Sequence, residues 1–168
     1  MNWAAIRNRH KKCEREYKEY LGDMLEDQKV EEEVVEYYKD MERIAKEVNE
    51  SAGKDKYEWV YQEWMEYILE DYGMKVVIEK EERIEENETE KCKVRLDVYI
   101  ENKEIIIEIK THGNKKGIEQ LKKYMKLLKK QTGFLVQYVK GKVSVLMIYE
   151  NNGEYYIYDG SVKYKHTA

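Results

Sequence analysis

Residues 94–112 read VRLDVYIENKEIIIEIKTH, and they place two strand-like runs on either side of a short turn. Each run carries charge inside its apolar stretch: Asp97 in the first, then Glu108 and Lys110 after three consecutive isoleucines in the second. Side chains of a strand alternate between its two faces, so Glu108 and Lys110 share one face. A tight turn between the runs predicts an antiparallel hairpin that brings Asp97 beside them.

The expected register makes this pairing specific. With Asn102 at the centre of the turn, position 97 lies opposite about position 107, within one residue of Glu108. Two neighbouring carboxylates repel each other, and a hard divalent cation removes that repulsion because it takes oxygen ligands. Lys110 can hold a water near the metal or stabilise charge on a phosphate. These groups suit phosphodiester hydrolysis, and the alternative is an accidental arrangement of charges on a water-facing surface.

The hairpin sits within a predicted α/β fold. An amphipathic helix over 57–72 ends at Gly73, and a second helix over 118–132 ends at Gly133. A hairpin followed by a strand-helix-strand unit implies a mixed sheet flanked by helices. Strands are expected at 74–80, 93–100, 104–111, 134–140, 143–150 and 154–160, with an acidic turn at 81–91 and a loop at 112–117.

The first 50 residues read as helical and predict an N-terminal extension. Apolar residues recur there at heptad-like spacing: Val30, Val34, Tyr37, Met41, Ile44 and Val48. The small polar stretch 51–56 marks a boundary, which divides the chain into 1–52 and 53–168. Two interpretations of the extension remain: a helical hairpin packed on the second domain, or a seam through which two chains form a homodimer.

Composition limits the class of protein. The chain has 168 residues, 42% hydrophobic and 39% charged, with no proline. No apolar run approaches the roughly 18 residues of a membrane span, and no signal peptide is recognisable, so we expect an intracellular protein. Two cysteines do not make a disulfide framework or a metal knuckle. A composition this rich in Lys and Glu is typical of thermophiles.

The net charge of −4 hides a strong asymmetry. Residues 110–142 carry ten Lys against the single acid Glu119, whereas residues 79–90 carry seven Glu against Lys80 and Arg83. A basic field beside a hydrolytic site attracts a polyanion. The lysines at positions 115, 116, 122 and 123 are the predicted substrate contacts, although a Lys-rich helix can also be an ordinary solvated face.

The same residues resemble a known family. Asp97 followed by Glu108-Ile109-Lys110 resembles the PD-(D/E)xK nuclease superfamily, with Leu96 where the family name puts Pro. Gln120 and Tyr124 match the QxxxY motif of RecB-like nucleases. The resemblance covers roughly residues 57–150 and implies a restriction-endonuclease-like αβββαβ core.

The resemblance also implies residue roles. Asp97, Glu108 and the carbonyl of Ile109 would bind Mg²⁺ or Mn²⁺, and Lys110 would be the catalytic lysine. Gln120 and Tyr124 would position the substrate. Relatives often add a Glu from the first core helix, where we select Glu58 over Glu63 and Glu66 because it flanks the apolar face.

The expected activity is therefore metal-dependent hydrolysis of single-stranded, duplex or branched DNA. Two alternatives remain: an RNA nuclease, and a non-catalytic module that binds DNA or protein through a nuclease-like fold.

Overall fold

The computed structural model describes residues 30–54, 56–85, 91–112 and 116–166. Over these ranges the predicted alternation of helices and strands is present. The helices are α2 (Glu32–Ala52), α3 (Glu58–Asp71) and α4 (Lys116–Leu128). The strands are β1 (Val76–Glu85), β2 (Lys91–Ile100), β3 (Ile105–Lys110), β4 (Thr132–Val139), β5 (Lys142–Asn151), β6 (Glu154–Tyr158) and β7 (Lys163–His166).

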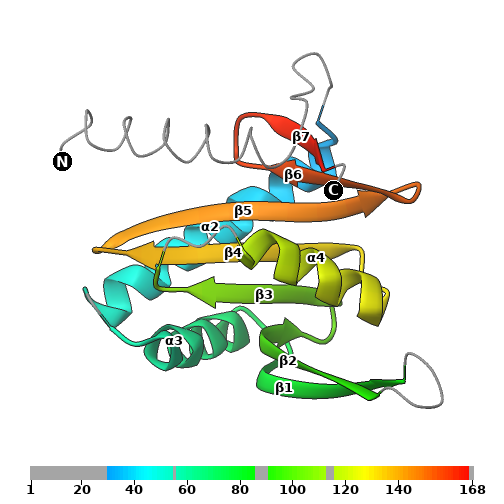
Figure 1. Ribbon diagram of the computed structural model, residues 1–168. Coiled ribbons are helices and arrows are strands. Elements are labelled where there is room, and N and C mark those ends of the chain that lie inside the picture. Colours follow the sequence, from blue (N-terminus) through cyan, green and yellow to red (C-terminus); the bar gives the residue numbers. More distant parts are fainter. Residues whose placement is uncertain (1–29, 55, 86–90, 113–115, 167–168) are drawn as a thin grey trace.

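The strands form one mixed sheet in chain order, β1 to β7 (Figure 1). Strand β3 pairs with β4 in parallel, and every other neighbouring pair is antiparallel. The parallel pair needs a crossover connection, and α4 supplies it. The α/β fold with a mixed sheet is thus confirmed.

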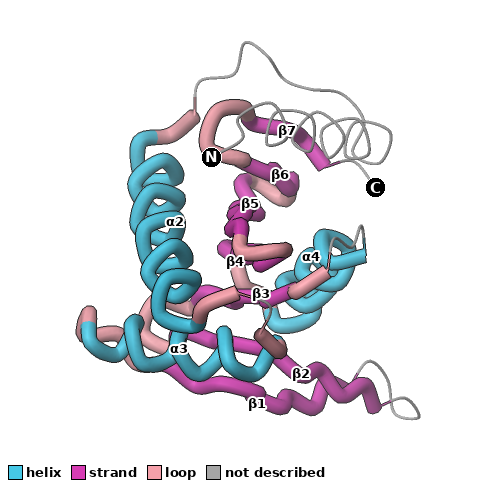
Figure 2. The backbone as a smooth tube through the Cα atoms, turned by 90° about the vertical axis from the view of Figure 1, so that its left-hand side faces the viewer, coloured by secondary structure: helices cyan, strands magenta, loops and turns pink. Residues whose placement is uncertain are grey.

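Helices cover both faces of this sheet, with α2 and α4 on opposite sides (Figure 2). One apolar cluster joins α2 and α3 to the sheet through residues such as Ile107, Ile109 and Phe134. The other joins α4 to the opposite face through residues such as Ile106 and Leu135. Because β3 contributes to both clusters, its charged end lies between the two helical layers.

The apolar seam of α2 packs within the chain. Val34, Met41, Ile44 and Val48 are buried in the cluster that α2 shares with α3 and the sheet. Tyr38, one residue beyond the expected seam position, donates its hydroxyl hydrogen to the carbonyls of Val145 and Asp159. The seam is therefore occupied by its own sheet, which leaves the dimerisation alternative without support. The part of the expected helical extension before Val30 lies outside the described residues.

Three local expectations were wrong. The acidic turn expected at 81–91 is shorter, because β1 continues to Glu85 and β2 begins at Lys91. Helix α4 ends at Leu128, with Lys129 in a left-handed conformation (φ 55°), and Gly133 lies inside β4. The expected strands stopped at residue 160, yet Lys163–His166 form β7 and His166 is buried.

The division of the chain at residues 52 and 53 remains a prediction. None of the helices in the described parts of the chain is long and apolar enough to cross a membrane.

Candidate active site

The β2–β3 hairpin ends its ladder next to Asp97. The pairs Ile100–Ile105, Tyr99–Ile106 and Val98–Ile107 form the ladder, and continuing this register places Asp97 opposite Glu108. Instead of a further backbone bond, the Ile109 amide donates to Asp97 Oδ2 at 2.9 Å. The predicted pairing was off by one position, and the structure brings the two carboxylates together.

Strand β2 also changes faces at Asp97. Val94 and Leu96 pack in the α4 cluster, whereas Val98 and Ile100, at the same parity, pack in the α3 cluster. The simple alternation predicted for this strand therefore fails at one position. On β1, Glu79 lies across from Asp97 and has a positive φ of 52°, outside the paired residues. The regular β1–β2 pairing is therefore interrupted at this one position, next to the carboxylates.

Glu108 is the buried member of the pair, with 1% of its surface exposed. Burial and the adjacent Asp97 carboxylate raise its pKa to about 9, and Lys110 only partly offsets this effect. Its Oε1 atom is buried without a hydrogen-bond partner. A buried, unsatisfied carboxyl oxygen is costly, so this position calls for a cationic or protonated partner.

A cavity of about 390 Å³ collects most of the predicted site residues. It is lined by residues from β2, β3 and both flanking helices: Glu58, Asp97, Glu108, Lys110, Gln120 and Tyr124. Gln120 Nε2 donates to Tyr124 Oη at 2.6 Å, which fixes these two α4 side chains relative to each other. Residues separated by up to 66 positions thus meet in one place.

Glu58 is the only one of the three α3 candidates among the cavity-lining residues. It is the first residue of α3, whereas Glu63 is exposed on the helix away from the cavity. Within the described residues no group of three or more His, Cys, Asp or Glu side chains is arranged to hold a metal ion. Glu58 therefore lines the site without closing a three-carboxylate cluster.

The residues at the hairpin end fit a divalent cation. Asp97 and Glu108 supply carboxylate oxygens, and the unsatisfied Glu108 Oε1 leaves one of them without any protein donor. Oxygen donors of this kind are what Mg²⁺ and Mn²⁺ select. The carbonyl of Ile109, whose amide is anchored by Asp97, is the third predicted ligand.

The predicted substrate-binding lysines differ in their surroundings. Lys116 and Lys123 are exposed on α4. Lys122 is only 6% exposed and places Nζ 5.0 Å from the centre of the Tyr155 ring. Burial and neighbouring Lys126 lower the pKa of Lys122 to about 8. Lys122 therefore offers little surface to a phosphate, and Lys115 lies outside the described residues.

Four further cavity-lining residues were not predicted: Trp59, Gln62, Glu79 and Arg95. The sequence could have indicated Arg95 as a residue of the site, because it lies two positions before Asp97 on the same strand. Glu79 depends on the β1–β2 pairing, where its Oε1 accepts from Arg95 Nη2 at 2.6 Å. Trp59 and Gln62 lie off the apolar stripe of α3 that the sequence suggested, so only the packed structure places them here.

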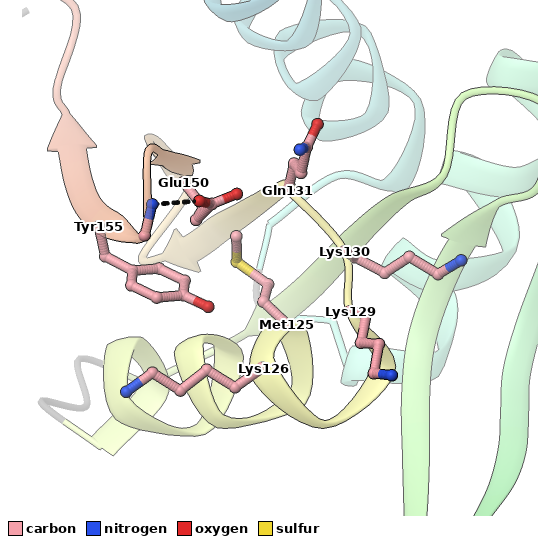
Figure 3. Close-up of a pocket in the computed structure, with 8 residues that line it drawn as sticks. Met125, Lys126, Lys129, Lys130, Gln131, Glu150 and Tyr155 are labelled. Atoms are coloured by element: carbon pink, nitrogen blue, oxygen red, sulfur yellow. Dashed lines mark hydrogen bonds between the residues drawn. The ribbon is translucent and has the colours of Figure 1, made fainter.

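A second cavity of about 350 Å³ lies on another side of α4 and is basic (Figure 3). Lys126, Lys129 and Lys130 line it together with Tyr155. Its one carboxylate, Glu150, accepts a hydrogen bond from the Gly153 amide at 2.6 Å. It has no carboxylate pair, so its chemistry suits contact with an anion and not metal binding.

The mixed seven-stranded sheet, its flanking helices and the hairpin-end carboxylates define a restriction-endonuclease-like fold. A family model described as the PD-(D/E)XK nuclease superfamily matches residues 35–147, and the chain belongs to that superfamily. The matched segment includes most of α2, which the expected resemblance over 57–150 had left out.

Solved and curated proteins add little beyond the family. The chain is similar to the protein in the crystal structure of SSO0001, at 25% identity and a TM-score of 0.43. The similarity covers 69% of this chain and 61% of that one, so this chain spans less than two thirds of that protein's length. A search of curated proteins finds no match.

Proposed function

We propose that this protein is a divalent-metal-dependent nuclease that hydrolyses DNA phosphodiester bonds. The observation that carries the proposal is the buried Glu108 beside Asp97, in one cavity with Lys110. Burying Glu108 beside Asp97 costs stability, because Glu108 must either keep a proton or repel Asp97, and metal binding gives the pair a use. Superfamily membership supports phosphodiester hydrolysis as the reaction class.

Each residue has a proposed role that its position supports. Asp97, Glu108 and the Ile109 carbonyl bind the cation, and Glu58 adds a ligand through water or after a side-chain movement. When bound, the cation supplies a water of lowered pKa and polarises the scissile phosphate. Lys110 Nζ donates to the attacking water or to the phosphate oxygen on which charge develops.

The helix α4 residues are proposed to position the substrate. The Gln120–Tyr124 hydrogen bond at 2.6 Å holds both polar groups at the wall of the cavity. Their QxxxY spacing supports placement in the RecB-like group. Exposed Lys116 and Lys123, together with the basic cavity at the end of α4, are suited to contact successive phosphates of DNA.

The test is cleavage of end-labelled single-stranded DNA, duplex DNA and RNA in Mn²⁺, Mg²⁺ or EDTA. Wild type is compared with Lys110→Ala, and Lys123→Ala is the control that removes the same charge from exposed α4. We expect metal-dependent cleavage of DNA that falls at least about 100-fold in Lys110→Ala and only a few-fold in Lys123→Ala.

Each other outcome has a defined meaning. Equal cleavage by wild type and Lys110→Ala would contradict the assigned site. Preferential cleavage of RNA would show that the substrate is RNA and not DNA. Salt-sensitive DNA binding without any cleavage, in every metal, would favour the non-catalytic binding module.

A further inference from the structure

Trp59 is an exposed aromatic residue at the mouth of the candidate active site. It lies in the first turn of α3 and lines the same cavity as Asp97, Glu108 and Lys110. It is 55% exposed, whereas Glu108 is 1% exposed, so the indole lies nearer the solvent than the carboxylates. Tryptophan gains much from burial, and a half-exposed indole therefore leaves a large apolar surface without a covering group.

The residues around Trp59 make this surface part of a substrate pocket. Gln62 lies three positions later, on the neighbouring part of the helix surface, and lines the same cavity. Its amide can both donate and accept a hydrogen bond. Arg95 lines the cavity as well and is more than half exposed. An aromatic face, an amide and a guanidinium thus line the same cavity as the proposed reaction centre.

We infer that Trp59 stacks on an unpaired base of single-stranded DNA next to the scissile phosphate. This inference rests on the proposed nuclease function and specifies its substrate. An aromatic face recognises any base through stacking, but a base inside a duplex already has both faces covered by its neighbours. A substrate that offers its phosphate to Lys110 and a bare base to Trp59 is therefore single-stranded at that point.

Exposed aromatic residues elsewhere on α3 supply a matched control. Tyr67 is 65% exposed, lies two turns further along the helix and does not line the cavity. If the exposed rings of α3 served a general protein contact, Tyr67 would matter as much as Trp59. If Trp59 acts on the substrate, only Trp59 affects DNA binding.

The experiment measures binding of a fluorescent single-stranded oligonucleotide and of a matched hairpin duplex in EDTA, so that no cleavage is required. We expect Trp59→Ala to weaken single-strand binding roughly 5- to 150-fold, the cost of losing one stacked base. Trp59→Phe should restore most of the affinity. Duplex binding should change less than about twofold, and Tyr67→Ala should leave both affinities unchanged.

A second arm moves one abasic site through the oligonucleotide. At one position, the missing base should weaken binding by wild type but cause no further loss in Trp59→Ala, because both changes remove the same contact. Any of three results would overturn the inference. The first is an equal loss of single-strand and duplex binding in Trp59→Ala, and the second is unchanged single-strand binding in that variant. The third is that the losses of affinity from Trp59→Ala and from the abasic site add at every position.

Cleavage is measured separately. Binding that depends on Trp59 without any cleavage would refute the proposed nuclease function. Cleavage together with binding that does not depend on Trp59 would refute only the stacking inference.

Discussion

At the scale of single residues, the burial of Glu108 beside Asp97 is the main source of instability in the site. Burial and Asp97 raise its pKa from 4.5 to about 9. Between these values the folded protein keeps a proton that the unfolded chain releases, so the free energy of unfolding decreases as pH rises. Metal binding displaces that proton and reverses the penalty.

The first prediction concerns Glu108→Gln in EDTA. The amide keeps the shape of the side chain and cannot ionise, so the variant should lack the pH-dependent loss. We expect its free energy of unfolding, relative to wild type, to increase by roughly 1–3 kcal/mol between pH 5 and pH 8. Chemical denaturation at several pH values measures this difference. Exposed Glu63→Gln is the control, and parallel curves for Glu108→Gln and wild type would refute the assigned penalty.

The sequence predicted this carboxylate pair because strand periodicity and turn length are local properties. The same reasoning missed Trp59 and Glu79, because their place in the cavity depends on contacts between elements far apart in the chain. Glu79 reaches the site through the β1–β2 ladder and a positive φ. Trp59 reaches it because α3 packs against β1, β2 and β3.

At the scale of elements, the packing of α4 on β4 explains a glycine that sequence reasoning misplaced. Gly133 lies in β4, and a Cβ there would come within 2.8 Å of Leu121 Cδ1 and 3.0 Å of Met125 Sδ. The glycine therefore permits close approach of the helix and does not end it. This packing supports α4, which carries Gln120 and Tyr124.

We predict that Gly133→Ala lowers the free energy of unfolding by about 1–3 kcal/mol through overpacking. In a Leu121→Ala background the added methyl group has room, so the further cost should be smaller. Urea denaturation of wild type, the two single variants and the double variant measures the coupling free energy between the two positions. Purely additive losses would show that the two positions do not compete for the same space.

The acidic run at residues 79–90 is another segment whose structure its own residues did not reveal. Seven glutamates between 79 and 90 favour a turn, yet β1 extends to Glu85. The backbone register pairs β1 with β2 as far as Glu85 and Lys91. Pairing with a neighbouring strand supports an extension that local propensity opposes.

At the scale of the whole molecule, charge is separated between the two helical layers. Basic side chains of α4 and its following turn line the cavity in Figure 3. Helix α2, on the opposite side of the sheet, carries mixed charges with intrahelical pairs such as Arg43–Asp40 and Lys46–Glu42. DNA should therefore approach the α4 side.

We predict that Lys129→Gln weakens single-stranded DNA binding and reduces the slope of log affinity against log salt by about 0.7, the contribution of one phosphate contact. Exposed Lys39→Gln on α2 removes the same charge from the opposite side and should leave the slope unchanged. Fluorescence anisotropy between low and moderate salt measures both. Equal changes of the salt slope in the two variants would indicate an effect of net charge and no defined DNA contact at Lys129.

The central claim is that Asp97 and Glu108 bind a divalent cation, and calorimetric titration with Mn²⁺ tests it most directly. Wild type should bind Mn²⁺ and release protons in amounts that depend on pH, because Glu108 must ionise to become a ligand. Asp97→Asn and Glu108→Gln should each lose at least about tenfold in affinity, whereas Glu63→Gln should match wild type. Unchanged Mn²⁺ affinity in both site variants would contradict the account.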